Sequence, residues 1–224
     1  MILDFNELKK VTVVFDKTAS HNVDPQKGFT PLCPNELPVD DGHNIVNELN
    51  GQNSIVKIKT VSKDVHPSNG IWIATEESPQ FSPVEGDNVD IRWNAHCVSG
   101  TYGMELLDGL GDMSDFDFFL AKGFEPHLHP YSSCYHDIAK KISTGLIEWL
   151  NSRGITTVIV GGLALNFCVG ETIIDLVNSG FQVIANLGAC RGIGTEEEIK
   201  KYVDMLINDY NVIVVESYKD IEVI

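Results

Sequence analysis

Short apolar runs rich in β-branched residues recur along the chain, and stretches with helical spacing separate them. Runs of this nearly continuous apolar character are typical of strands that are covered on both faces. Strand, helix and strand in repetition imply right-handed crossovers and a mainly parallel sheet. The predicted fold class is therefore α/β, a three-layer α/β/α arrangement around a mainly parallel central sheet. The expected strands are Val11 to Phe15, Ile55 to Val61, Phe118 to Ala121, Thr157 to Val160, Phe181 to Ala185 and Val212 to Val215.

Three segments carry apolar residues at the spacing that places them on one face of a helix. One of them opens with Thr195 and has Glu198 three residues later, which is a capping-box pattern. By contrast, Pro67 to Leu110 is dense in turn formers and has no clear periodicity, so we expect a long, ordered loop region that carries function. The expected helices are Asp137 to Leu150, Cys168 to Asn178 and Thr195 to Ile207.

Composition limits the class of protein. The chain has 224 residues, 43% of them apolar, and no linker-like stretch, which favours a single compact domain over residues 1–224. The start, MILDFNELKK, lacks the basic cap and apolar run of a secretory signal, and no stretch is long and apolar enough to span a membrane, so we expect a soluble, cytoplasmic protein.

A formal charge of −16 with dispersed lysines and arginines argues against nucleic acid or a membrane surface as partner. The five cysteines are scattered and form no CxxC pair, so we expect most of them to be buried thiols and one to be a candidate reactive cysteine.

Charged residues stand where expected strands end, which is where ligands gather in parallel sheets. Asp24 follows the first expected strand in a loop rich in proline and glycine, and is either a turn former or a catalytic acid. Lys122 follows the strand that ends at Ala121, and is either a strand-end lysine that reaches solvent or an ammonium held near an active centre. Charge alone does not decide between these alternatives.

A possible metal site follows the second expected strand. Asp64 and His66 alternate along an extended segment, so their side chains point the same way and can converge on one cation. With His96 as a third donor, two nitrogens and one carboxylate would suit zinc, iron or manganese. The alternative is a capped surface histidine at 66 and a satisfied core histidine at 96. The remaining histidines of the later loop, namely His127, His129 and His136, are expected to be solvated.

Cys168 is the candidate nucleophile. It follows a buried strand and the pair Gly161 and Gly162, and it is expected to begin a helix. A helix N-terminus aims backbone N–H groups and a positive dipole end at the sulfur, which favours the thiolate. The glycines allow close backbone approach in the turn. The alternative is an inert buried thiol in a helix that faces the sheet.

Taken in order, these segments resemble the isochorismatase-like hydrolase superfamily and, within it, the nicotinamidases. The resemblance covers nearly the whole chain, and each motif is weak alone while the ordered set is specific. It rests on Asp24, Phe29-Thr30-Pro31-Leu32-Cys33-Pro34, Asp64-x-His66-Pro67, Trp93-x-x-His96-Cys97-x-x-Gly100-Thr101, Ala121-Lys122-Gly123, Gly161-Gly162-Leu163-Ala164-x-x-x-Cys168-Val169 and Ala189-Cys190-Arg191-Gly192.

The resemblance implies an isochorismatase-like, Rossmann-type fold and an amidohydrolase that converts nicotinamide and water to nicotinate and ammonia through a thioester, in NAD salvage. It implies a homo-oligomer and one divalent metal ion, with zinc as the first choice and iron or manganese as the others. It also implies a cis peptide before Ala164. The implied roles are a catalytic triad of Asp24, Lys122 and Cys168, metal ligands Asp64, His66 and His96, an oxyanion hole from the backbone N–H groups of Ala164 and Cys168, and aromatic pocket walls at Phe29 and Trp93.

Some positions depart from the usual family pattern and leave rival interpretations. Val65 stands where many relatives have tryptophan and Asn94 where proline is common, so the preference among pyridine carboxamides is open. Leu165-Asn166 likewise replaces a frequent Thr-Asp or Thr-Glu pair. The rivals are a relative acting on another amide or on an enol ether such as isochorismate, and a catalytically inactive protein of the same fold. Cys168 argues against the enol-ether hydrolase, and the Asp64, His66 and His96 set argues against a plain carbamoyl amidase. The presence of all six key residues argues against an inactive protein.

Overall fold

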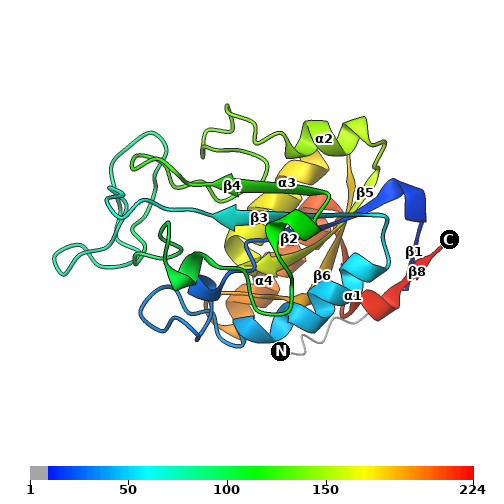
Figure 1. Ribbon diagram of the computed structural model, residues 1–224, viewed down its shortest axis with the longest axis horizontal. Helices are drawn as coiled ribbons and strands as arrows, with labels where there is room; N and C mark the ends of the chain where they lie inside the picture. The colour runs from blue at the N-terminus through cyan, green and yellow to red at the C-terminus, as the bar shows by residue number, and fades with distance from the viewer. Residues whose placement is uncertain (1–9) are drawn as a thin grey trace.

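The computed structural model describes residues 10–224, so residues 1–9, on which the expectation of no secretory signal rests, lie outside the described part. Its centre is a six-stranded sheet in the order β4-β3-β2-β5-β6-β7 (Figure 1). Every neighbouring pair of this sheet is parallel, as predicted. The strands are β2 (Thr18–Val23), β3 (Ile58–Asp64), β4 (Phe118–Lys122), β5 (Thr157–Leu163), β6 (Gln182–Arg191) and β7 (Ile213–Val215).

The sheet is covered on both faces, which gives the three layers expected from the sequence. On one face Val158 and Val160 pack in a core cluster with residues of the helices α2, α3 and α4. The intervening Ile159 points the opposite way and packs in a second cluster beside the small β1–β8 sheet. Helix α1 contacts β2, β5 and β6. Alternation along β5 therefore supplies apolar side chains to both faces, which is why its apolar run is continuous.

The four α-helices agree only in part with the sequence prediction. Helix α4 begins after Thr195, whose side chain and that of Glu198 form the predicted capping box. The helix expected from Asp137 to Leu150 was wrong over its first half, because Lys140 and Gly145 have left-handed backbone and the Asp137 carboxylate accepts backbone N–H groups of the loop. Helix α1 was not predicted. The helices are α1 (Val46–Ser54), α2 (Leu146–Ser152), α3 (Gly170–Asn178) and α4 (Glu196–Tyr210).

The first strand of the sheet differs from the prediction. The apolar run at Val11 forms β1 (Val11–Val13), which pairs with β8 (Ile221–Val223) in a separate two-stranded sheet. The strand that precedes Asp24 is β2, whose sequence TASHNV has no apolar run but is buried throughout. Its polar side chains make internal hydrogen bonds: Asn22 donates to the Asn53 side chain at 2.9 Å, and His21 Nδ1 lies 2.8 Å from Thr60 Oγ1. Buried hydrogen bonds take the place of apolar contacts here, and a hydropathy pattern does not detect them.

Loops gather beyond the carboxyl ends of β3 and β4 (Figure 1, left). The segment between these strands contains only short 3-10 turns and isolated bridges, so the long ordered loop predicted there is confirmed. No helix within residues 10–224 is long and apolar enough to cross a membrane. The short helical turns are η1 (Phe15–Lys17), η2 (Lys27–Phe29), η3 (Gly42–Ile45), η4 (Tyr102–Met104), η5 (Met113–Asp115), η6 (Leu165–Val169) and η7 (Tyr218–Asp220).

Candidate active site and imidazole cluster

The sheet brings the candidate site residues to one edge. Lys122 ends β4 and lies opposite Asp64, the last residue of β3, in the strand register. Asp24 follows β2, whose last residue Val23 lies opposite Gly162 of β5. Because β4, β3, β2 and β5 are neighbours, four separate segments of the sequence meet at their carboxyl ends.

A buried ammonium lies between two buried carboxylates. Lys122 Nζ is 3.1 Å from Asp24 Oδ2 and 2.5 Å from Asp64 Oδ1, and all three side chains are at most 2% exposed. The hydroxyl of Ser62 donates to Asp24 Oδ1 at 2.7 Å. Lys122 also donates to the carbonyl of Pro130 at 3.3 Å. The lysine is thus a buried ammonium and not a strand end that reaches solvent.

The two carboxylates are electrostatically unequal. Burial raises the pKa of Asp24 to about 6, although Lys122 and Ser62 pull it down. Burial would also raise the pKa of Asp64, but Lys122 and His66 outweigh it, so this pKa is lowered. The pKa of Lys122 is raised well above its usual range because the carboxylates overcome its own desolvation. Asp24 is therefore the carboxyl group that can gain and lose a proton near neutral pH.

Cys168 lies beside this charged cluster. Its Sγ is 3.8 Å from Lys122 Nζ, and it lies within 4.8 Å of carboxylate oxygens of Asp24 and Asp64. Burial raises the pKa of the Cys168 thiol well above its usual value, with Lys122 opposing and the carboxylates adding to the shift. The sequence predicted a favoured thiolate; the resting side chain is instead a thiol, because desolvation and two negative neighbours outweigh one cation.

The turn that carries Cys168 differs from the expected helix start. Cys168 lies in a π-helical turn, η6, and helix α3 begins at Gly170, so the prediction that the helix starts at the cysteine was wrong by two residues. The peptide bond between Leu163 and Ala164 is cis, as the resemblance implied. Gly162 has a φ of +141°, and a Cβ there would lie 1.9 Å from the Val23 carbonyl oxygen. Only glycine allows this approach of β5 to the strand end that carries Asp24.

Three imidazoles meet next to Asp64. Nitrogen atoms of His66, His96 and His129 all lie within 4.8 Å of one another. Nδ1 of His66 is 3.1 Å from the carbonyl oxygen of Gly123, and Nδ1 of His96 is 2.6 Å from that of Asn94. These contacts orient both rings and leave each Nε2 for another partner. Asp64 Oδ2 lies 3.5 Å from His66 Nε2.

The environment of His129 differs from the one expected from the sequence. His129 was expected to be a solvated loop histidine, but its side chain is 3% exposed and stacks on the ring of His66. His127 is exposed, as expected, and His136 is half-buried. The reason is that the chain turns inward at Leu128 and runs buried through Pro130. No periodicity marks such a turn, so sequence reasoning had no signal for it.

A small cavity of about 20 Å³ lies at this site. Phe29, Trp93, Ala164 and Cys168 all line it, so the pocket and oxyanion residues implied by the resemblance surround the same space as the thiol. Val65 and Asn94 are absent from the lining. Asp64 and His96 also line it. Residues that the sequence did not assign to the site complete the wall: Leu37, His129, Tyr131, Phe167 and Ile193.

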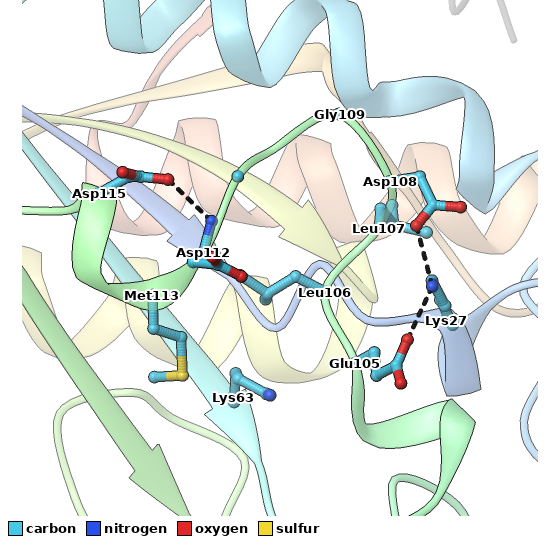
Figure 2. A pocket seen from close by; sticks show the side chains of 11 residues that line it. Lys27, Lys63, Glu105, Leu106, Leu107, Asp108, Gly109, Asp112, Met113 and Asp115 are labelled. Carbon is cyan, nitrogen blue, oxygen red and sulfur yellow. Dashed lines mark hydrogen bonds and ion pairs between the residues drawn. The ribbon is translucent and has the colours of Figure 1, made fainter.

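A larger hollow lies elsewhere and has different chemistry. Its volume is about 550 Å³, and Lys27 enters it between Glu105 and Asp108, 2.9 Å from each carboxylate (Figure 2). Lys63 and further acidic residues complete its lining. None of the cysteines or histidines lines it, so its size does not make it the centre of the chemistry.

Comparison with known proteins agrees with this arrangement. The sequence profile of the Isochorismatase domain matches residues 18–205, which include every strand of the central sheet except β7. The chain belongs to the isochorismatase family. Within the family it is 32% identical to the nicotinamidase of Acinetobacter baylyi over 174 residues, which are 76% of this chain and 79% of that protein.

Solved structures of the family superpose closely. The nicotinamidase and pyrazinamidase of Acinetobacter baumanii has a TM-score of 0.82 and 30% identity, over 92% of this chain and 98% of that one. The yeast nicotinamidase bound to the inhibitor nicotinaldehyde has a TM-score of 0.78 and 26% identity, over 89% of this chain and all of that one. The predicted α/β class is confirmed.

Proposed function

We propose that this chain is a nicotinamidase, which hydrolyses nicotinamide to nicotinate and ammonia in NAD salvage. The observation that carries the proposal is the buried Lys122 ammonium, which lies between Asp24 and Asp64 and 3.8 Å from the Cys168 sulfur. A nucleophile, a base and a cation held close to one another are the parts that amide hydrolysis through a covalent intermediate requires. The names of the relatives, nicotinamidases in both comparisons, supply the substrate.

The first half of the reaction forms a thioester. The Asp24 carboxylate takes the proton of the Cys168 thiol, and the Lys122 ammonium stabilises the thiolate that results. The sulfur attacks the amide carbon, and the carbonyl oxygen gains negative charge. The backbone N–H groups of Ala164 and Cys168 receive this oxyanion, a contribution of about 3 to 4 kcal/mol per donor. The proton held by Asp24 passes to the leaving nitrogen, and ammonia departs.

The second half restores the enzyme. Asp24, again ionised, takes a proton from a water molecule, whose oxygen attacks the thioester carbon. The carbon–sulfur bond breaks, and the proton on Asp24 returns to the Cys168 thiolate. The nicotinic acid that forms releases its carboxyl proton to solvent and leaves as nicotinate. A pKa of about 6 suits Asp24 to both directions of transfer, because a group that titrates near the working pH gives and takes a proton at low cost.

The imidazole cluster fits a divalent metal. Nε2 of His66 is buried without a hydrogen-bond partner, and the ring is oriented by the contact of its other nitrogen. With His96 and the carboxylate of Asp64 beside it, the donor set is the nitrogen-rich kind that zinc, iron or manganese accepts. When bound, the metal supplies a Lewis-acid contact that orients the substrate's pyridine nitrogen. Zinc is our first choice.

The pocket favours a flat aromatic amide over the rival substrates. Phe29, Trp93 and Phe167 line the cavity, and Trp93 and Phe167 meet edge to face at 4.9 Å between ring centroids. A pyridine ring matches such walls better than an aliphatic chain does. An enol ether such as isochorismate offers no amide carbon for the Cys168 thiol to attack.

Chelation tests the function directly. We expect purified protein to release ammonia from nicotinamide, to lose at least 90% of that rate with a chelator, and to recover it with zinc, iron or manganese. A coupled ammonia assay measures each state. A fully metallated protein without turnover would contradict the proposal and point to another amide or to an inactive member of the family.

His66→Ala supplies the matched test of the metal ligands. We expect this variant to bind less than one equivalent of metal after dialysis, because it loses a buried nitrogen donor, while His127→Ala, an exposed histidine, binds as the wild type does. Metal content by mass spectrometry is the measurement. Equal metal content in the two variants would remove His66 from the ligand set.

The pH dependence of the rate follows from Asp24. Its pKa is raised to about 6, and only the ionised carboxylate accepts the thiol proton. We therefore expect kcat/KM to be constant at neutral pH and to fall tenfold per unit below about pH 6. Initial rates between about pH 5 and pH 8, with folding checked by circular dichroism, measure this profile. A rate that does not change over this range would show that a group of lower pKa, and not Asp24 with a pKa of about 6, accepts the thiol proton.

A further inference from the structure

The side chain of His129 is buried without a polar partner. It is 3% exposed, and neither of its ring nitrogens has a hydrogen-bond partner among the described residues. A buried donor or acceptor left unsatisfied costs about 1 to 3 kcal/mol, so such groups are rare in folded proteins unless something binds them. An aromatic side chain without nitrogen would fill the same space at no such cost.

The surroundings of His129 indicate what binds it. Its ring stacks on that of His66 at 5.2 Å and 18°, and it lies 5.7 Å from the ring of His96. Trp72 and Trp93 close the other sides, at 4.4 and 6.0 Å between centroids. Tyr131 is a further neighbour, at 5.2 Å between ring centroids, but its hydroxyl donates to Asp90 and accepts from Trp93 Nε1. The imidazoles of His66 and His96 are therefore the neighbours whose nitrogens can share a cation with His129.

The spacing of the imidazole nitrogens suits a cation. Three buried nitrogens within 4.8 Å of one another, from His66, His96 and His129, match the spread of donors around a single transition-metal ion.

The two carboxylate oxygens of Asp64 face different partners, Lys122 on one side and His66 on the other. One of its oxygens lies 2.5 Å from Lys122 Nζ, and the other lies 3.5 Å from His66 Nε2. Its closest contact is therefore to the ammonium of the proposed triad. Its second oxygen remains beside the imidazoles, so the metal side of the site has His66, His96 and one oxygen of Asp64 as donors. One more protein donor would complete a four-coordinate site.

We propose that His129 is a third imidazole ligand of the metal site, in addition to His66 and His96. The inference rests on the metal of the proposed function and deepens it, because a site with three nitrogens selects zinc and its transition-metal neighbours over magnesium and calcium. Its competitor is a His129 that only walls the substrate pocket, which it also lines.

Zinc affinity and the cobalt spectrum test the ligand. His129→Phe keeps an aromatic ring without a nitrogen, and His127→Phe makes the same change at an exposed position two residues earlier. We expect His129→Phe to weaken zinc binding by about 100-fold or more, beyond the 10- to 100-fold typical of residues that only support a ligand, and to alter the visible bands of the cobalt(II) protein. His127→Phe should leave both unchanged.

Two outcomes decide the proposal. A loss of zinc affinity of at least about 100-fold together with a changed cobalt spectrum supports it, and any other result for a folded His129→Phe protein overturns it. If that variant does not fold, His129→Cys gives the answer: a thiolate-to-cobalt charge-transfer band absent from the wild type supports ligation, and its absence overturns it. Zinc binding lost in His66→Ala but kept in His129→Phe would sink this inference alone, whereas wild-type protein that binds zinc without hydrolysing nicotinamide would sink only the proposed function.

Discussion

Replacing Cys168 with alanine lowers the rate of ammonia release from nicotinamide by about 10⁴-fold or more, because removal of a nucleophile eliminates the covalent route. The variant remains folded, because the change removes only one sulfur atom. Cys168 is buried, with 5% of its surface exposed. The free energy of unfolding is expected to fall by no more than about 1 kcal/mol. Steady-state rates and urea denaturation of the same preparation measure the two effects.

Cys33→Ala is the matched control for this experiment. Cys33 is also buried, at 9% exposure, but it does not line the cavity beside Cys168. We expect its turnover to stay within a factor of about two of wild type, because the sulfur takes no part in the reaction. A Cys168→Ala protein that kept full activity would end the thioester mechanism, and an equal loss in both variants would indicate damage to the fold.

Replacing Lys122 with methionine affects both stability and activity. The change leaves Asp24 and Asp64 buried without their cation, and loss of one partner of a buried ion pair costs about 3 to 5 kcal/mol. Loss of the ammonium beside the sulfur also removes electrostatic stabilisation of the thiolate, for which we expect a fall in kcat of about 10²- to 10³-fold. Urea denaturation and steady-state kinetics measure the two losses.

The pH dependence of stability gives a second signature of Lys122→Met. Without the cation, the folded-state pKa values of both carboxyl groups lie above the unfolded value of about 3.9. The folded protein then binds protons more tightly than the unfolded chain, so stability decreases as pH rises through this window. We expect the difference from wild type to be smaller at about pH 5 than at about pH 7.

Lys140→Met is the control, because Lys140 also lies between two carboxylates. It is 38% exposed and contacts Glu171 at 3.2 Å and Asp175 at 2.6 Å. Solvent reaches Lys140 and Glu171, although the Asp175 side chain is only 4% exposed. We therefore expect a loss of about 1 kcal/mol, well below that of Lys122→Met, and unchanged turnover. Equal losses for the two lysine variants would contradict the special cost assigned to the buried one.

Parts of the fold were predictable because local sequence and tertiary environment agree. The apolar runs at Thr157 and Phe181 became central strands, and the Thr195–Glu198 capping box began a helix as predicted. Strand β2 was missed because its polar residues are buried in a hydrogen-bond network with α1 and β3, which gives no apolar signal. Helix α1 was missed for a similar reason, since the side chain of its buried Gln52 receives a hydrogen bond from Asn186.

The sequence by itself determined the fold class and the chemical inventory at the strand ends, because strand periodicity and the order of motifs are local properties of the chain. It placed Asp24, Lys122 and Cys168 at ends of neighbouring segments without showing how close they come. Only the tertiary structure decided that burial keeps Cys168 a thiol, and that His129 turns inward to join the other imidazoles. Desolvation and the meeting of distant segments depend on how the whole chain packs, and no spacing along the sequence records them.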